Sequence, residues 1–198
     1  MRKLTMKMSF SVDGFVSTPN GNNDWIFKSS TPDSKAWALE KSQDAGLLVM
    51  GRKSYEAWVT YWPTAQGPFA APMNEIPKAV FTLQKKFKAP PTTSSSPAAK
   101  SWAEARVFSG NLTDEIKKLK QEPGKPISAV GGAGFMRSLI AANLIDEYHL
   151  AIHPVVLGAG LTIFSDLAKP LDLKLVDSKA FSGGIVVHTY QPAFDNAP

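Results

Sequence analysis

The sequence predicts an α/β protein, with a three-layer α-β-α arrangement around a mixed sheet of about eight strands. Three observations lead to this prediction. Apolar, strand-like runs alternate with segments of helical spacing through most of the chain, which favours a parallel core. Two of these runs end in glycines that open a helix. The last two runs, 171–176 and 184–190, follow one another without a helix between them, which indicates an antiparallel C-terminal edge.

The elements are expected in a definite order along the chain. Residues 4–12 alternate apolar and polar side chains with period two, which predicts the first strand. Thr31, Pro32 and Asp33 supply a cap, a proline for the first helical turn and an acid for the positive helix end, so a helix is expected over 31–44. Further apolar runs predict strands at 47–50, 78–83, 104–108, 127–130 and 144–153, with helices at 55–58, 114–121 and 135–140.

Length and composition indicate one ordinary globular domain over 1–198, since 43% of the residues are hydrophobic and 20% are charged. The chain has no cysteine, which excludes disulfides, thiolate nucleophiles and zinc–thiolate clusters. Residues 89–101 are rich in proline and serine and predict a low-complexity surface loop.

The net charge of +5 and the pI near 9.3 raise the question of a nucleic-acid partner. The basic residues are scattered, however, and the densest cluster is only 85–88, so we expect no nucleic acid. The first seven residues are too interrupted by charge for a signal peptide, and no apolar stretch approaches the ~20 residues of a membrane span. We therefore expect a cytoplasmic protein that does not enter a membrane.

A glycine cluster follows the strand predicted at 127–130 and opens the next helix. Gly131, Gly132 and Gly134 carry no Cβ, so the backbone there can adopt positive φ and approach a ligand closely. Free N–H groups and the helix dipole would together favour an anion at this point. The cluster thus indicates a phosphate-bearing cofactor, although a turn that only reverses the chain would have the same composition.

A second junction of this kind follows the strand at 47–50. Gly51 is followed by Arg52, Lys53 and Ser54, which add two cations and a hydroxyl group. The stretch 46–54 is not a Walker A motif, because Arg52 stands where that motif needs a Gly-Lys pair and the residues between its glycines are strand-like. A nucleoside-triphosphatase activity is therefore not expected.

Four motifs, in the same order along nearly the whole chain, resemble one family. The stretch 50–56 resembles the Met-Gly-Arg-x-Thr-Trp-Glu signature of the dihydrofolate reductase fold, and 130–135 resembles that fold's second glycine motif. Ser11-Val12-Asp13-Gly14 and the stretch 154–164 resemble one branch, the reductase domain of the riboflavin-biosynthesis protein RibD and its stand-alone relatives. The resemblance implies a dihydrofolate-reductase-like fold, NADPH-dependent reduction of a small heterocyclic, pterin- or pyrimidine-like substrate, and a homodimer.

The resemblance also implies roles for the residues at matching positions. Gly51, Arg52, Lys53 and Ser54 would meet the cofactor's phosphates, and Arg52 or Lys53 could reach the 2′-phosphate of NADPH. Thr82 and Leu83 would flank the adenosine end. Phe15 and Val16 would lie near the nicotinamide ring. The remaining cofactor contacts would come from Val130, Gly131, Gly132, Ala133, Gly134 and Phe135.

Two carboxylates are candidates for orienting the substrate or helping to deliver a proton. Asp13 matches its motif better and is preferred, although an Asp-Gly pair also makes a turn. Asp33 begins the predicted helix at 31–44, where it could equally stabilise the helix dipole. Trp37, on the same helix, is the expected substrate contact. His149 and His153 share a strand face, but no third ligand is patterned nearby, so we expect structural roles and no metal.

Two other functions stay open at this point. One is a true dihydrofolate reductase, and the other is a non-catalytic protein that binds a dinucleotide. If the chain forms a homodimer, the apolar stretch 144–164 could pair across the subunits.

Overall fold

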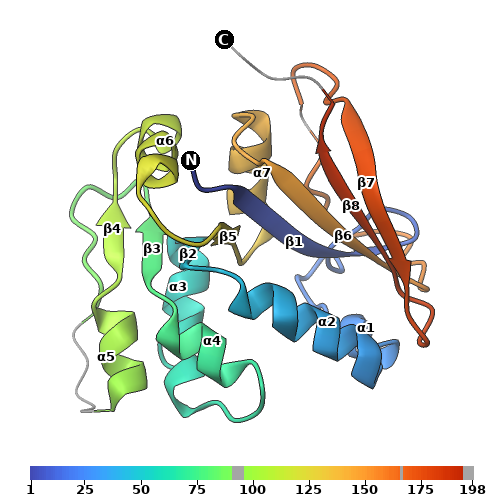
Figure 1. Ribbon diagram of the computed structural model, residues 1–198, viewed down its shortest axis with the longest axis horizontal. Coiled ribbons are helices and arrows are strands. Elements are labelled where there is room, and N and C mark those ends of the chain that lie inside the picture. The colour runs from blue at the N-terminus through green and yellow to red at the C-terminus, as the bar shows by residue number, and fades with distance from the viewer. Residues whose placement is uncertain (91–95, 166, 194–198) are drawn as a thin grey trace.

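The structure is a computed structural model, and it describes residues 1–90, 96–165 and 167–193. Its strands are β1 (Leu4–Ser11), β2 (Leu47–Gly51), β3 (Lys78–Phe81), β4 (Arg106–Phe108), β5 (Ile127–Ala129), β6 (Glu147–His153), β7 (Leu173–Ala180) and β8 (Val186–Pro192). They form one eight-stranded sheet in the order β4-β3-β2-β5-β1-β6-β8-β7 (Figure 1). Strands β4 to β6 of this order pair in parallel, whereas β8 is antiparallel to both β6 and β7. The parallel core with an antiparallel C-terminal edge is confirmed.

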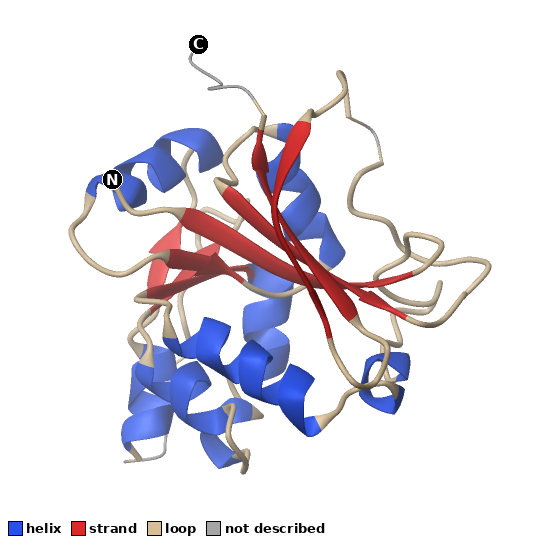
Figure 2. Cartoon of the chain, turned by 45° about the vertical axis from the view of Figure 1, so that its right-hand side comes forward, coloured by secondary structure: helices blue, strands red, loops and turns tan. Residues whose placement is uncertain are grey.

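Helices cover both faces of this sheet. They are α1 (Trp25–Lys28), α2 (Pro32–Gln43), α3 (Arg52–Trp58), α4 (Ala70–Glu75), α5 (Pro97–Ala103), α6 (Leu112–Gln121), α7 (Ala133–Ala141) and the 3-10 helix η1 (Trp62–Thr64). Figure 2 shows the sheet between helices on either side. On β2, Leu47 and Val49 belong to the core under α6 and α7, whereas Leu48 and Met50 belong to the core under α3 and α5. The alternating burial of one strand thus joins the three layers.

The structure corrects the prediction of a surface loop over 89–101. From Pro97 onward the chain forms α5, whose cap residue Ser96 accepts a hydrogen bond from the Ala99 N–H at 3.1 Å. Trp102 on this helix is fully buried. Because β3 and β4 are parallel, the chain between them must cross over the sheet, and α5 lies on that crossover. Residues 91–95 lie outside the described part of the chain.

The C-terminal hairpin is also displaced from its expected position, since β7 spans Leu173–Ala180 rather than 171–176. Every residue of β7 after Leu173 is exposed, and the strand carries an irregularity between Leu175 and Asp177. An edge strand without a buried face has no period-two pattern, so its limits were not visible in the sequence. The short helices α1 and α4 were not predicted either.

The pairing of 144–164 across subunits stays a prediction, but the backbone of β6 is not available for it. This strand lies inside the sheet, with β1 on one side and β8 on the other, so both of its edges are already hydrogen-bonded. The open edges of the sheet belong to β4 and β7. In the described part of the chain, no helix is long and apolar enough to cross a membrane.

Candidate active site

The turns after β2 and β5 lie next to each other at the carboxyl edge of the parallel core. Gly131 has a φ of +108°, a backbone conformation that L side chains rarely adopt. A Cβ on Gly131 would lie 2.5 Å from Ser54 Oγ, so this position has no room for a side chain. The Gly132 N–H donates to the same Ser54 hydroxyl at 3.0 Å. The structure therefore brings the two glycine junctions together, across the starts of α3 and α7.

The start of α7 offers backbone donors to a ligand. The first N–H groups of a helix have no partner within that helix, and the dipole is positive there. Gly132 uses its N–H for Ser54, which leaves the amides of Ala133 and Gly134 at the front of the helix. A Cβ on Gly134 would meet no heavy atom within 4 Å, so the space beside this turn is open. These residues fit the phosphate groups of a dinucleotide.

The cations expected to hold phosphate differ in their freedom. Arg52 donates from Nη1 to both carboxylate oxygens of Glu56, at 2.7 and 2.6 Å, so its guanidinium is already paired. Lys53 is exposed next to it. Thr82 is buried at the end of β3, whereas Leu83 is 98% exposed and presents an apolar side chain. Of these four residues, Lys53 and Leu83 have the side chains that are open to a ligand.

Three residues expected near the cofactor pack into the protein itself. The Phe135 ring stacks on Phe81 with 5.5 Å between centroids, and a Cβ on Gly51 would lie 3.2 Å from the Phe135 Cβ. Val16 is buried in the main core, and Phe15 is half-buried. Gly51 thus makes room for Phe135. A contact of Phe135, Phe15 or Val16 with the cofactor stays a prediction.

Asp13 joins two loops at the end of β1. Its carboxylate accepts hydrogen bonds from the backbone N–H groups of Leu157, at 3.1 Å, and Gly158, at 2.7 Å. A side-chain hydrogen bond from Ser11 and these backbone N–H groups hold the pKa of Asp13 below its usual range. This geometry explains the Asp-Gly motif as a tie to the loop 154–161. It does not place the carboxylate in a cavity wall.

Asp33 ties the start of α2 to the β7–β8 hairpin. Its carboxylate accepts hydrogen bonds from the Ser182 N–H at 2.9 Å and from the Ser182 hydroxyl at 3.0 Å. The hydroxyl of Thr31 also donates to it, and this contact contributes most to holding the pKa of Asp33 well below its usual range. Asp33, like Asp13, is absent from the walls of the cavities described next.

Two cavities lie between α2 and the sheet face formed by β1 and β6. The larger has a volume of about 460 Å³ and the smaller about 180 Å³, and both are lined by Lys7 and Phe69. Trp37 lines the larger cavity. Trp58 lines the smaller one, and its ring lies 3.8 Å from the place that a Cβ on Gly131 would occupy. The smaller cavity therefore shares a wall with the glycine turn.

Lys7 stands between the two cavities and was not among the residues predicted from the sequence. Its Nζ donates to the Ala38 carbonyl at 3.0 Å and to the Ser42 hydroxyl at 3.2 Å. An ammonium group has three N–H donors, so one remains for a ligand. Burial lowers the pKa of Lys7 to about 8. The available signal was the polar face that Thr5, Lys7 and Ser9 form on an internal strand.

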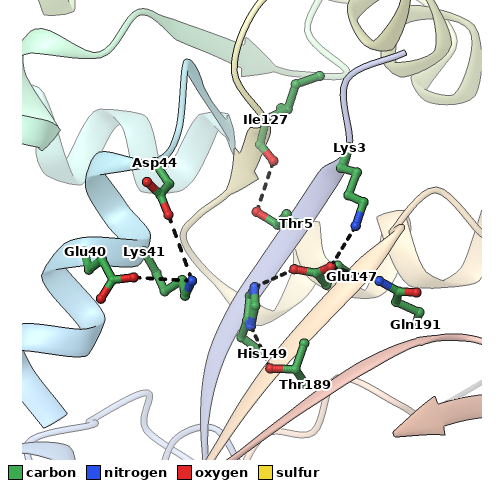
Figure 3. A network of polar contacts seen from close by, with 10 residues as sticks. All are labelled: Lys3, Thr5, Glu40, Lys41, Asp44, Ile127, Glu147, His149, Thr189 and Gln191. Atoms are coloured by element: carbon green, nitrogen blue, oxygen red, sulfur yellow. Dashed lines mark hydrogen bonds and ion pairs between the residues drawn. The ribbon is translucent and has the colours of Figure 1, made fainter. Parts of the chain in front are cut away.

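His149 lines the smaller cavity, but both of its nitrogens have partners in the protein. Nε2 lies 3.1 Å from a carboxylate oxygen of Glu147, and Nδ1 lies 3.2 Å from the Thr189 hydroxyl (Figure 3). Lys3 and Gln191 hold the other oxygen of Glu147, each at 3.0 Å. Burial lowers the pKa of His149 despite the carboxylate beside it. The ring is therefore held in place by the sheet rather than free to act on a substrate.

His153 connects three parts of the larger cavity's wall. Nδ1 lies 2.8 Å from the Ser29 hydroxyl and Nε2 lies 3.1 Å from the Ser9 hydroxyl. The Trp25 ring meets it edge-on, with 5.3 Å between centroids. Burial lowers the pKa of His153 to about 4, so the ring is neutral at physiological pH. It links β6, β1 and the segment after α1.

The charge of the cavities is positive. Lys7 and Lys35 line the larger cavity and Lys7 and Lys41 line the smaller one, while neither wall includes an aspartate or glutamate among the described residues. A ligand that carries a carbonyl or anionic oxygen is complementary to such walls. A ligand that must be held by a carboxylate is not.

The fold is dihydrofolate-reductase-like. The dihydrofolate reductase from Enterococcus faecalis, solved with NADP(H), is similar in fold, with a TM-score of 0.62 at 15% identity over 97% of both chains. Within this class, the chain belongs to the family described as the RibD C-terminal domain, whose model matches residues 2–187. Both the family and the fold class predicted from the sequence are confirmed.

Two relatives have nearly the same extent as this chain. The uncharacterized protein YyaP from Bacillus subtilis (strain 168) is 32% identical over 189 residues, which covers 96% of this chain and 94% of that protein. A crystal structure of a putative riboflavin biosynthesis protein from Shewanella sp. PV-4 has a TM-score of 0.74 at 20% identity, and covers 97% of this chain and 99% of that one. Proteins of about this length that are similar to the chain over nearly all of its residues are thus known.

Proposed function

We propose that this chain is an NADPH-dependent reductase of the RibD type, which transfers hydride to a small heterocyclic, pterin- or pyrimidine-like substrate. One observation carries the proposal. Trp58 belongs to the wall of the smaller cavity and also lies beside the Gly131 turn. Hydride transfer needs cofactor and substrate in contact, and here the phosphate-fitting turn adjoins the cavity. Membership of the RibD C-terminal domain family supports the same activity.

Bound NADPH would supply the hydride, and the protein would bind and orient it. The amides at the start of α7 and the ammonium of Lys53 would hold phosphate oxygens. Leu83, almost fully exposed beyond β3, offers an apolar surface to the adenine. Gly134 leaves the approach to the α7 amides clear.

Lys7 would act on the substrate. Its remaining N–H can donate a hydrogen bond to an oxygen or nitrogen acceptor of the substrate. The ammonium group is mostly protonated at pH 7 because its pKa is about 8. Lys7 can therefore polarise a carbonyl or imine that accepts hydride, and can deliver a proton to it. Trp37 and Phe69 would cover the substrate and exclude water.

A true dihydrofolate reductase is the weaker alternative, because the described residues of both cavity walls include no carboxylate to hold a pterin. Turnover of dihydrofolate in preference to non-folate pyrimidines and pterins would reverse this judgement. A protein that binds the dinucleotide without catalysis would bind NADPH but oxidise it with no substrate of the panel.

The test begins with titration of the purified protein by NADPH and by NADH, followed by tryptophan emission and energy transfer to the nicotinamide. We expect NADPH to bind, and expect Gly132→Val to abolish binding because its side chain would enter the space in front of the α7 amides. Lys118→Gln, on the outer surface of α6, is the matched control. The proposal is refuted if neither NADPH nor NADH binds. Turnover of a panel of pyrimidines and pterins, read as NADPH oxidation, then identifies the substrate.

A further inference from the structure

The serine side chains in the wall of the larger cavity already have partners in the protein. They are Ser9, which pairs with His153 at 3.1 Å, Ser30, which donates to the Ile26 carbonyl at 2.8 Å, and Ser34, which donates to the Thr31 carbonyl at 3.0 Å. His153 has a hydroxyl partner at each ring nitrogen. What this wall offers to a ligand is therefore the remaining N–H of Lys7 and the exposed ammonium of Lys35.

The rest of the same wall is apolar. It includes the side chains of Ile26, Phe27, Trp37, Phe69, Ile185 and Val187. Phe27 is 68% exposed, so the apolar surface continues outward to the molecular surface. An apolar body buried against these side chains gains roughly 25 cal/mol for each Å² removed from water.

We propose that the substrate of this protein is a flat ring compound without a ribosyl phosphate: the faces of its ring pack against the apolar side chains of the larger cavity, and one carbonyl or anionic oxygen group on the ring binds Lys7. This inference rests on the proposed reductase function, because it assigns the substrate class of that site. It distinguishes the substrate from a ribosyl phosphate. A sugar carries several hydroxyl groups, and most of them would lose their hydrogen bonds to water against a wall that is mainly apolar.

The first experiment compares three probes with the cofactor-free protein by isothermal titration calorimetry. The probes are 2-naphthoate, with a flat apolar body and one carboxylate, 2-naphthylmethanol, its neutral analogue, and uridine 5′-phosphate, a ribosyl phosphate. We expect 2-naphthoate to bind at least about tenfold more tightly than uridine 5′-phosphate, because it alone satisfies both parts of the wall. Equal or tighter binding of uridine 5′-phosphate that Lys7→Met weakens, or no binding of 2-naphthoate, would overturn the inference.

Two variants then assign the contacts. Lys7→Met keeps the length of the side chain and removes its charge. The affinity for 2-naphthoate should therefore fall about tenfold, while the affinity for 2-naphthylmethanol stays within about threefold of the wild-type value. Phe27→Ala, at an exposed position, should weaken both aromatic probes and leave folding intact. Lys118→Met on α6 controls for net charge. If Lys7→Met does not fold, the probe ranking and Phe27→Ala still decide the question. Lack of response to both variants would overturn the inference.

The outcome is separable from that of the proposed function. The probes are measured without nucleotide, whereas the function is tested by NADPH titration of the same preparation. NADPH binding together with a preference for uridine 5′-phosphate that Lys7→Met removes refutes the substrate class alone. Tight 2-naphthoate binding without NADPH binding refutes the reductase.

Discussion

Replacing Gly131 by alanine tests whether the paired glycine turns are built for close backbone approach. The alanine would hold φ near +108° against its own preference, and its Cβ would lie 2.5 Å from Ser54 Oγ. Ser54 Oγ is also the acceptor of the Gly132 N–H. To make room for the new Cβ, Ser54 must move and release this hydrogen bond. We expect both a less stable protein and weaker NADPH binding.

The size of the effect follows from these two contacts. A left-handed backbone costs an alanine roughly 1–2 kcal/mol relative to glycine. Loss of the hydrogen bond between Gly132 and Ser54 costs about 0.5–1.5 kcal/mol. The free energy of unfolding should therefore fall by about 1.5–3.5 kcal/mol, which for a chain of this length lowers Tm by about 3–14 °C. Thermal unfolding followed by tryptophan fluorescence measures this shift.

Gly134→Ala is the matched control, since it makes the same substitution three residues later. Its φ is not positive, its new Cβ would meet no heavy atom within 4 Å, and it lies in the first turn of α7. Helix propensity should stabilise this variant by about 0.5 kcal/mol. If Gly131→Ala melts within about 2 °C of the wild type, a shift worth under about 1 kcal/mol, the reasoning about this turn is refuted.

Four further predictions follow from the site. Lys53→Gln should weaken the binding of NADPH about tenfold and change the binding of NADH little. Arg52→Gln should have a smaller effect on NADPH binding, because Glu56 already pairs with Arg52. Nucleotide titration of both variants decides this. The pH profile of kcat/KM should be level near pH 7 and fall above about pH 8, as Lys7 loses its proton, and Lys7→Met should remove that limb. Burial lowers the pKa of His153 to about 4, below the value near 6.5 of an unfolded chain. Between pH 4 and 6.5 the unfolded state therefore binds more protons than the folded state, so the free energy of unfolding should fall by roughly 3 kcal/mol over this range as the pH drops. Urea unfolding measures this fall, which should be smaller in His153→Gln. Finally, light scattering should give a dimer mass at micromolar concentration; a monomer mass would refute the homodimer.

The sequence predicted the parallel core well, because buried strands and glycine junctions leave local signals. The run at 47–50 is apolar throughout, and in the structure its side chains are buried on both faces of the sheet. The helix α5 gave a misleading signal, since its residues follow a proline- and serine-rich stretch and its place depends on the crossover between β3 and β4. The bounds of β7 were hidden for the opposite reason, because an exposed edge strand imposes no pattern on its sequence.

The site was predicted in part, and the part that was missed depends on packing between distant residues. The glycine junctions carry their own backbone requirement, which is why they were visible. Lys7 becomes notable only when α2 is placed over β1, since its partners Ala38 and Ser42 are more than thirty residues away in the sequence. A lysine on a strand is otherwise an ordinary surface residue.

Asp13 and Asp33 show why motif position is a weak guide to proton chemistry. Hydrogen bonds hold the pKa of each carboxyl below its usual range, so both groups are ionised at neutral pH and cannot donate a proton. Each carboxylate is occupied by neighbouring N–H and O–H groups, and neither lines the two cavities described beside α2. Lys7 has the opposite properties: it is buried, it keeps a free N–H, and it is mostly protonated at pH 7. If the protein reduces a carbonyl or imine, Lys7 can supply the proton that follows the hydride, whereas the two aspartates tie neighbouring loops to the end of β1 and the start of α2.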